Sequence, residues 1–242
     1  MNFSIILNSR GRANLLRNLI SNIKDTASRI DEIELLIAID DDDSQSIALS
    51  KEEKPFDITF VIQPRPDSLN TSLTNLGKLA KGKYVFNLND DLTILTKSWD
   101  TIILSKIEEF KKKNSINDDI LYIGCSDTSM DKPTGSKYAS FPIITKKSID
   151  ILGFFMDPVF VGLGADSGLW RIFDSVNRVL YIEDVVLDHF FHSTIFAVMS
   201  PDLTAYEMRQ NSAKHFVDCT SYPIEEDTSK LKNYIENHEE KN

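Results

Sequence analysis

The stretch Tyr84-Val85-Phe86-Asn87-Leu88-Asn89-Asp90-Asp91 runs from a short apolar segment directly into two adjacent carboxylates. An earlier stretch has the same form, because the apolar run 33–39 ends in four successive aspartates at positions 40–43. Short apolar runs of this kind are typical of buried strands, and a parallel α/β sheet binds its ligands beyond the carboxyl ends of its strands. Two acidic strand ends therefore predict a polar site at one edge of such a sheet.

The first half of the chain alternates strand-like and helix-like segments. Apolar residues recur at helical spacing between positions 15 and 23 and again between 69 and 79, where Gly82 follows the second helix. Further strands are expected at 3–7 and 58–62. This alternation predicts an α/β, Rossmann-like fold, in which helices cover both faces of a mostly parallel central sheet.

The second half is less regular. Helices are expected at 99–110, 148–152, 165–176 and 203–216, strands at 120–124 and 179–182, and a polar loop at 126–140. From residue 225 the chain is charged and poor in apolar residues, so it is either a solvated tail or a loosely docked final helix. Since no repeat or linker divides the chain, we expect one domain over 1–222 and a charged tail over 223–242.

Composition excludes several classes of protein. Among the 242 residues, 41% are hydrophobic, which is enough for a sizeable core, and the net charge of −10 argues against general nucleic-acid binding. The two cysteines, Cys125 and Cys219, are too few for a disulfide framework or a zinc cluster. The sequence has neither a signal peptide at its start nor an apolar run long enough for a transmembrane segment. We therefore expect a cytoplasmic protein, or one that is peripheral at a membrane.

The two acidic strand ends allow different interpretations. Oxygen ligands like those of the segment 89–91 suit Mg²⁺ or Mn²⁺, which bridge protein carboxylates to a substrate diphosphate, although a solvated acidic turn has the same appearance. In the segment 40–43, an aspartate could cap a helix that begins near Ser44. Alternatively, one of these carboxylates could accept hydrogen bonds from a base or a ribose.

Three residues of the second half are also candidates. Asp166 precedes an amphipathic stretch, so it is either a helix N-cap or a carboxylate that acts as a general base in a cleft. His189 and His192 follow an apolar segment with two acids in it, where a histidine is either structural or a metal ligand.

Taken together, these segments resemble the family-2-like glycosyltransferases, which are nucleotide-diphospho-sugar transferases with the GT-A fold. The resemblance runs from about Phe3 to His189 and depends on the order and spacing of short motifs. These motifs are the opening strand and loop at 4–12, the Ile-Asp-Asp strand end at 39–41, Asn75 and the Gly-Lys-Tyr turn at 82–84, Asn89-Asp90-Asp91 in place of Asp-x-Asp, the acceptor-side segment 147–155, Gly164-Ala165-Asp166, and Asp188-His189.

The resemblance implies roles for individual residues. Asp91 and His189 would bind the metal ion, Mn²⁺ or Mg²⁺, that bridges the donor diphosphate, and Asp166 would deprotonate the acceptor hydroxyl. The donor-binding residues would be Arg12, Asp40, Asp41, Asn75, Asn89 and Asp90. The nucleotide-binding half would span 1–95 and the acceptor-side half 96–222. The partners would be a nucleotide-sugar, by family frequency a UDP-sugar, and a glycan, lipid or protein acceptor.

A single base fits direct displacement with inversion at the sugar carbon. The chain departs from the family pattern at Asn89, which contributes no charge to a metal site, and at Ala165, where an acid usually precedes the base. The Gln-x-x-Arg-Trp signature of processive synthases is absent, which favours the addition of a single sugar. Two alternatives stay open: a sugar-nucleotidyltransferase, and a catalytically degenerate GT-A module that binds a nucleotide or a glycan.

Overall fold

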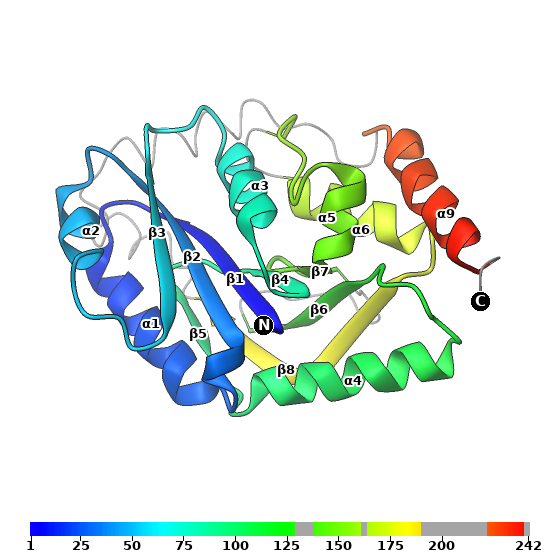
Figure 1. The fold of residues 1–242 in the computed structure, drawn as a ribbon, viewed down its shortest axis with the longest axis horizontal. Helices are drawn as coiled ribbons and strands as arrows, with labels where there is room; N and C mark the ends of the chain where they lie inside the picture. Colours follow the sequence, from blue (N-terminus) through cyan, green and yellow to red (C-terminus); the bar gives the residue numbers. More distant parts are fainter. Residues whose placement is uncertain (129–137, 161–163, 190–221, 240–242) are drawn as a thin grey trace.

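The computed structural model describes residues 1–128, 138–160, 164–189 and 222–239. Within these residues the strands form one eight-stranded sheet in the order β3-β2-β1-β4-β7-β6-β8-β5. Figure 1 shows helices on both sides of this sheet, as the alternating pattern predicts. No helix in the described part of the chain is long and apolar enough to cross a membrane.

The first half has the expected alternation. The elements are β1 (Phe3–Ser9), α1 (Ala13–Thr26), the 3₁₀ helix η1 (Ile30–Glu32), β2 (Ile33–Asp40), α2 (Ser44–Leu49), β3 (Asp57–Gln63), α3 (Leu69–Leu79) and β4 (Tyr84–Asn87). The four strands pair in parallel, β1 with β2 and β4, and β2 with β3. Their carboxyl ends therefore lie along one edge, which brings the two acidic strand ends onto the same side of the sheet.

The second half holds two strands that the sequence pattern does not reveal. The elements are β5 (Leu92–Ile94), α4 (Trp99–Lys113), β6 (Tyr122–Asp127), β7 (Ile143–Thr145), α5 (Lys146–Leu152), α6 (Ala165–Asp174), β8 (Val179–His189) and α9 (Glu225–Glu239). The unexpected strands are β5 and β7, which are too short for a recognisable period. β8 extends beyond the predicted 179–182, and the helix expected at 203–216 lies outside the described residues.

The strand β7 joins the two halves of the sheet. It pairs antiparallel with β4 on one side and with β6 on the other. β8 then pairs in parallel with β6 and antiparallel with β5. The sheet is thus mostly parallel, as predicted, with antiparallel pairs where the second half is attached.

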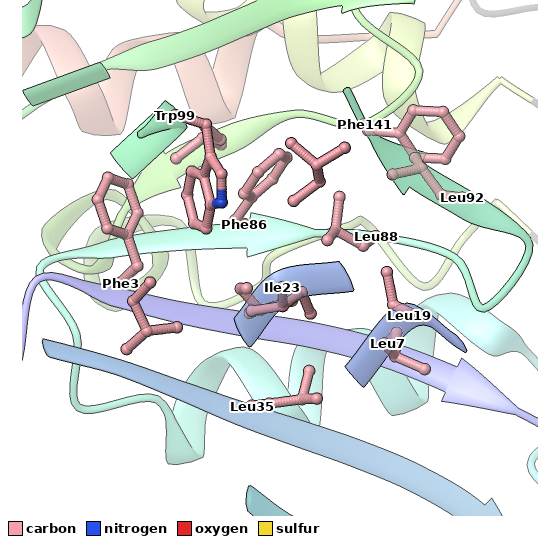
Figure 2. Close-up of a cluster of buried hydrophobic side chains, with 14 of the residues drawn as sticks. Phe3, Leu7, Leu19, Ile23, Leu35, Phe86, Leu88, Leu92, Trp99 and Phe141 are labelled. Carbon is pink, nitrogen blue, oxygen red and sulfur yellow. The ribbon is translucent and has the colours of Figure 1, made fainter. Parts of the chain in front are cut away.

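Two hydrophobic clusters pack on opposite faces of the sheet. One face is covered by α1 and α4, and here Trp99 lies with its ring centroid 5.3 Å from that of Phe3 and 5.8 Å from that of Phe86 (Figure 2). The other face is covered by α3, α5, α6 and α9. Since α9 is a helix with Leu231 fully buried among these elements, the docked-helix alternative for the chain after residue 225 is the one that the structure adopts.

Candidate active site

The acidic end of β4 lies beside the loop that follows β1. Asp90 is buried, and it accepts hydrogen bonds from Oγ of Ser9 (2.7 Å) and from Nη1 of Arg12 (2.8 Å). The same Arg12 nitrogen lies 3.4 Å from Oδ2 of Asp91. Because β1 and β4 are parallel neighbours, the loop after β1 brings a guanidinium to both carboxylates. The cluster is therefore partly neutralised within the protein.

The pair of β5 and β8 brings His189 to the same cluster. Leu92 is the register partner of His189, so Asp91, one residue earlier in the chain, lies beside the imidazole. Nε2 of His189 is 3.3 Å from Oδ1 of Asp91, and Phe141 packs edge-on against the imidazole at a centroid distance of 4.9 Å. Two residues almost one hundred positions apart in the sequence thus converge, as the predicted metal site requires. His192 lies outside the described residues.

The two adjacent carboxylates differ in their pKa. Burial raises the pKa of Asp90 above its ordinary value, and the nearby Arg12 does not offset this effect. Burial also acts to raise the pKa of Asp91, but the adjacent imidazole of His189 and the guanidinium of Arg12 outweigh it, so its pKa is lowered. Asp91 is therefore the carboxylate of this pair that most readily stays anionic.

The chemistry of this pair fits a divalent cation. Oδ1 of Asp91 is buried and, apart from its contact with His189, has no hydrogen-bond partner among the described residues, so it keeps lone-pair capacity for an ion. Ligands at about 2 Å from one ion lie roughly 3 Å apart, which is close to the observed separation of Oδ1 and the His189 nitrogen. The described residues hold no group of three or more metal-binding side chains. The remaining ligands would thus have to come from substrate oxygens and water.

The acidic end of β2 divides into residues with different partners. Asp43 caps α2 by accepting from the Ser46 amide (3.2 Å), and it also accepts from the Gly11 amide (2.8 Å), so the expected capping role belongs to this residue. Asp40 is buried 2.9 Å from Nη1 of Arg10, and its pKa is raised by burial despite that arginine. Asp41 is exposed. Asp40 and Asp41 thus remain free of the capping role.

Asp166 lies in the first turn of α6. The N-cap of α6 is Gly164, so the N-cap interpretation of Asp166 is wrong. Its Oδ2 accepts a hydrogen bond from the Tyr138 hydroxyl, and its Oδ1 accepts one from the Ser167 amide (2.9 Å). Burial raises the pKa of Asp166, and these two donors lower it only in part. A carboxylate with this pKa is suited to accept a proton.

The remaining sequence candidates are exposed. Asn89 lies at the edge of the β4 cluster, and Asn75 lies on the solvent-facing side of α3. At the start of α3, the buried Asn70 instead donates from Nδ2 to the Phe160 carbonyl (2.5 Å). The structure therefore adds Ser9, Arg10 and Tyr138 to the polar groups of the site. Ser9 and Arg10 lie within the motif at 4–12 but had no role assigned, and nothing in the sequence context of Tyr138 distinguishes it from an ordinary loop residue.

Comparisons with known proteins identify the family and agree with this fold. The model of glycosyl transferase family 2 matches residues 4–157, which is more than half of the chain. No curated protein sequence matches the chain.

Solved structures show a similar fold at low sequence identity. S. aureus TarS 1-349 in complex with UDP-GlcNAc is 13% identical with a TM-score of 0.58, over 80% of this chain and 60% of that one. The mannosyltransferase PcManGT from Pyrobaculum calidifontis, in complex with GDP-Man and Mn²⁺, is 14% identical with a TM-score of 0.58, over 79% of this chain and 57% of that one. The chain thus spans less than two thirds of these proteins. It belongs to glycosyl transferase family 2 and has the GT-A fold.

Proposed function

We propose that this family-2 glycosyltransferase moves a sugar from a nucleoside-diphosphate sugar to an acceptor hydroxyl, with Mn²⁺ or Mg²⁺ as cofactor and inversion at the sugar carbon. The observation that carries the proposal is the convergence of Asp91 and His189 at the acidic end of β4. A carboxylate and an imidazole at this separation are suited to hold one divalent ion, and within the described residues the buried carboxylate oxygen has no partner besides that imidazole.

The donor nucleotide would lie along the carboxyl ends of β1, β2 and β4. Asp40 or Asp41 would contact the base, while Arg12, Asn89 and Asp90 would lie near the ribose and diphosphate. We assign Asn75 to the donor set only through the family resemblance, because it is exposed on α3. The similar structures were solved with UDP-GlcNAc and with GDP-Man, which supports a nucleoside-diphosphate sugar, and we favour a UDP-sugar. Residues 1–95 would thus form the nucleotide-binding half and 96–222 the acceptor-side half.

Asp91 and His189 would hold the cation. When bound, such an ion offsets the negative charge that develops on the departing diphosphate. Arg12 contacts both Asp90 and Asp91 and supplies a fixed positive charge beside them. The divalent cation would thus meet two carboxylates whose negative charge Arg12 already neutralises in part.

Asp166 would act as the general base. Its carboxylate takes the proton of the acceptor hydroxyl while the acceptor oxygen forms a bond to the anomeric carbon of the sugar. The bond between that carbon and the diphosphate oxygen breaks, and the nucleoside diphosphate leaves with the electron pair. Because one base and no protein nucleophile takes part, this displacement inverts the configuration at the sugar carbon.

Titration calorimetry with UDP and with GDP, each with and without Mn²⁺, tests the donor site. We expect at least one of them to bind tightly only with Mn²⁺, and metal-independent binding would contradict the proposed cation site.

A panel of nucleotide-sugars should then reveal the donor through release of the nucleoside diphosphate. Binding without any turnover across the panel would favour a degenerate binding module. Consumption of a nucleoside triphosphate with a sugar phosphate, releasing pyrophosphate, would instead identify a nucleotidyltransferase.

A further inference from the structure

Each oxygen of the Asp166 carboxylate accepts a hydrogen bond from a neutral donor, one that precedes Asp166 in the chain and one that follows it. The Tyr138 hydroxyl donates to Oδ2, and the backbone amide of Ser167 donates to Oδ1. A carboxylate has about four lone-pair sites, so two hydrogen bonds fix its plane and still leave positions for an incoming proton. The orientation of Asp166 therefore depends on a residue that lies 28 positions away in the chain.

The backbone next to Tyr138 is anchored to the sheet. The hydroxyl of Tyr122, a fully buried residue of β6, accepts from the Ala139 amide (3.0 Å) and donates to the Ala139 carbonyl (3.1 Å). Ala139 also packs against Gly124 so closely that a Cβ on that glycine would lie 3.0 Å from its side chain. The position of Tyr138 is thus set by the rigid sheet.

We propose that Tyr138 is a positioning residue for the general base, and that its hydroxyl holds the Asp166 carboxylate in the orientation that receives the acceptor proton. This inference rests on the proposed function of Asp166 and adds a residue that acts through it. Tyr138 donates its hydroxyl proton to a carboxylate and remains neutral, because burial and the adjacent Asp166 raise its own pKa.

The hydrogen bond has a second consequence, for the titration of Asp166. A donor to a carboxylate stabilises the charged form, so the Tyr138 hydroxyl lowers the pKa of Asp166 and opposes the effect of burial. Asp166 also acts on Tyr122 of β6, whose pKa is raised first by burial and further by the nearby carboxylate. Both tyrosines are uncharged near neutral pH. Loss of the Tyr138 hydroxyl should therefore raise the pKa of Asp166 further.

A second tyrosine–aspartate pair provides a matched control. The hydroxyl of Tyr222 donates to Oδ2 of Asp157, and its ring packs against Phe160 at a centroid distance of 4.7 Å. This pair has the same chemistry and is also partly buried, but its hydroxyl donates to Asp157 and not to Asp166. The variants Tyr138→Phe and Tyr222→Phe each remove one hydroxyl from one such pair.

The experiment follows Asp166 by NMR in protein labelled with ¹³C at the aspartate carboxyl carbon, with Asp166→Asn to assign its signal. We expect Tyr138→Phe to raise the pKa of Asp166 by about one unit and Tyr222→Phe to leave it unchanged. A fluorinated tyrosine at position 138, which donates more strongly, should lower that pKa, and it keeps the ring should the phenylalanine variant fail to fold. An unchanged Asp166 pKa in the folded Tyr138 variants would overturn the proposal.

Measuring the turnover of the same variants distinguishes a failure of this inference from a failure of the proposed function. The rate of nucleoside diphosphate release from UDP-GlcNAc and from GDP-Man, with Mn²⁺, is measured against pH for the same variants. We expect the acid limb of kcat/KM in Tyr138→Phe to move to higher pH by the shift seen in the NMR titration, with donor affinity unchanged. If Asp166→Asn kept full activity, the base assignment itself would be wrong. If Asp166→Asn were inactive while Tyr138→Phe had the wild-type profile, only the role of Tyr138 would be wrong.

Discussion

The carboxylates of Asp91 and Asp166 are both largely shielded from solvent, but different side chains surround them. Asp91, at the end of β4, has the guanidinium of Arg12 and the imidazole of His189 beside it, and its pKa is lowered. Among the described residues, Asp166 at the start of α6 accepts from the neutral donors Tyr138 and Ser167, and its pKa is raised. The charge of the partners therefore decides which carboxylate stays anionic to hold a cation and which one can take a proton.

The largest expected effect comes from Asp166→Asn, which removes the proton-accepting group and keeps its shape. A general base contributes about 10²- to 10⁴-fold to the rate, so we expect kcat to fall by that factor. Donor affinity, measured by calorimetry with Mn²⁺ present, should stay within about twofold because Asp166 is proposed to act on the acceptor hydroxyl and not to bind the nucleotide. If donor affinity fell together with kcat, the two carboxylates would not have the separate roles that the comparison assigns to them.

The second effect tests the other carboxylate. Asp91→Ala removes a predicted cation ligand together with the negative charge, and we expect the Mn²⁺-dependent part of donor affinity to weaken by at least about tenfold. Calorimetry in the presence and absence of Mn²⁺ measures this part directly. The control is Asp184→Ala, which removes an exposed carboxylate of β8 that is paired with Lys106. A loss of affinity that is equal with and without Mn²⁺ would show that Asp91 does not act through a cation.

The third effect is the pH dependence of kcat/KM, whose acid limb should follow the ionisation of Asp166. Its pKa is raised above the ordinary carboxyl value because burial outweighs its two hydrogen bonds. The base works in its ionised form, so kcat/KM should be constant above this raised pKa and fall about tenfold for each pH unit below it. A profile of kcat/KM against pH for the wild-type enzyme checks the sign and the position of the limb. A limb at the ordinary carboxyl pKa, or a rise in activity on acidification, would contradict the assignment.

The first half could be predicted from the sequence because its order is local. Buried parallel strands leave nearly continuous apolar runs such as 33–39, where Glu34 is the one polar residue, and an amphipathic helix leaves a regular apolar stripe. The strands β1 to β4 and the main helices between them are therefore where the pattern places them. The acidic strand ends Asp40 and Asp90 could be recognised for the same reason. They follow directly on those runs.

The second half could not be predicted in the same way, because its order depends on tertiary contacts. β5 and β7 have three residues each and exist through their pairing with β8, β4 and β6. The sequence motif indicated His189 as a partner of Asp91, but the pairing of β5 with β8 is what brings the two together. Tyr138 carried no signal at all, since its role arises only when the segment 138–140 meets α6 in space.

The smallest effect on activity is expected at α9, which supports the region of Asp166 from outside. Leu231 is fully buried where α9 packs on α5 and α6, so Leu231→Ala should lower the free energy of unfolding by about 2–5 kcal/mol through the lost contacts and the cavity that remains. Denaturant unfolding measures this change, and the exposed neighbour Lys232→Ala should alter it by less than about 0.5 kcal/mol. Because α9 contributes no group to either carboxylate, donor affinity and kcat of the folded Leu231→Ala protein should stay within about twofold of wild type. A large fall in kcat with unchanged donor affinity would mean that α9 sets the geometry of Asp166 through α6. The position of Asp166 would then depend on distant packing. The position of Asp91 would not, because ion pairs within its own cluster hold it.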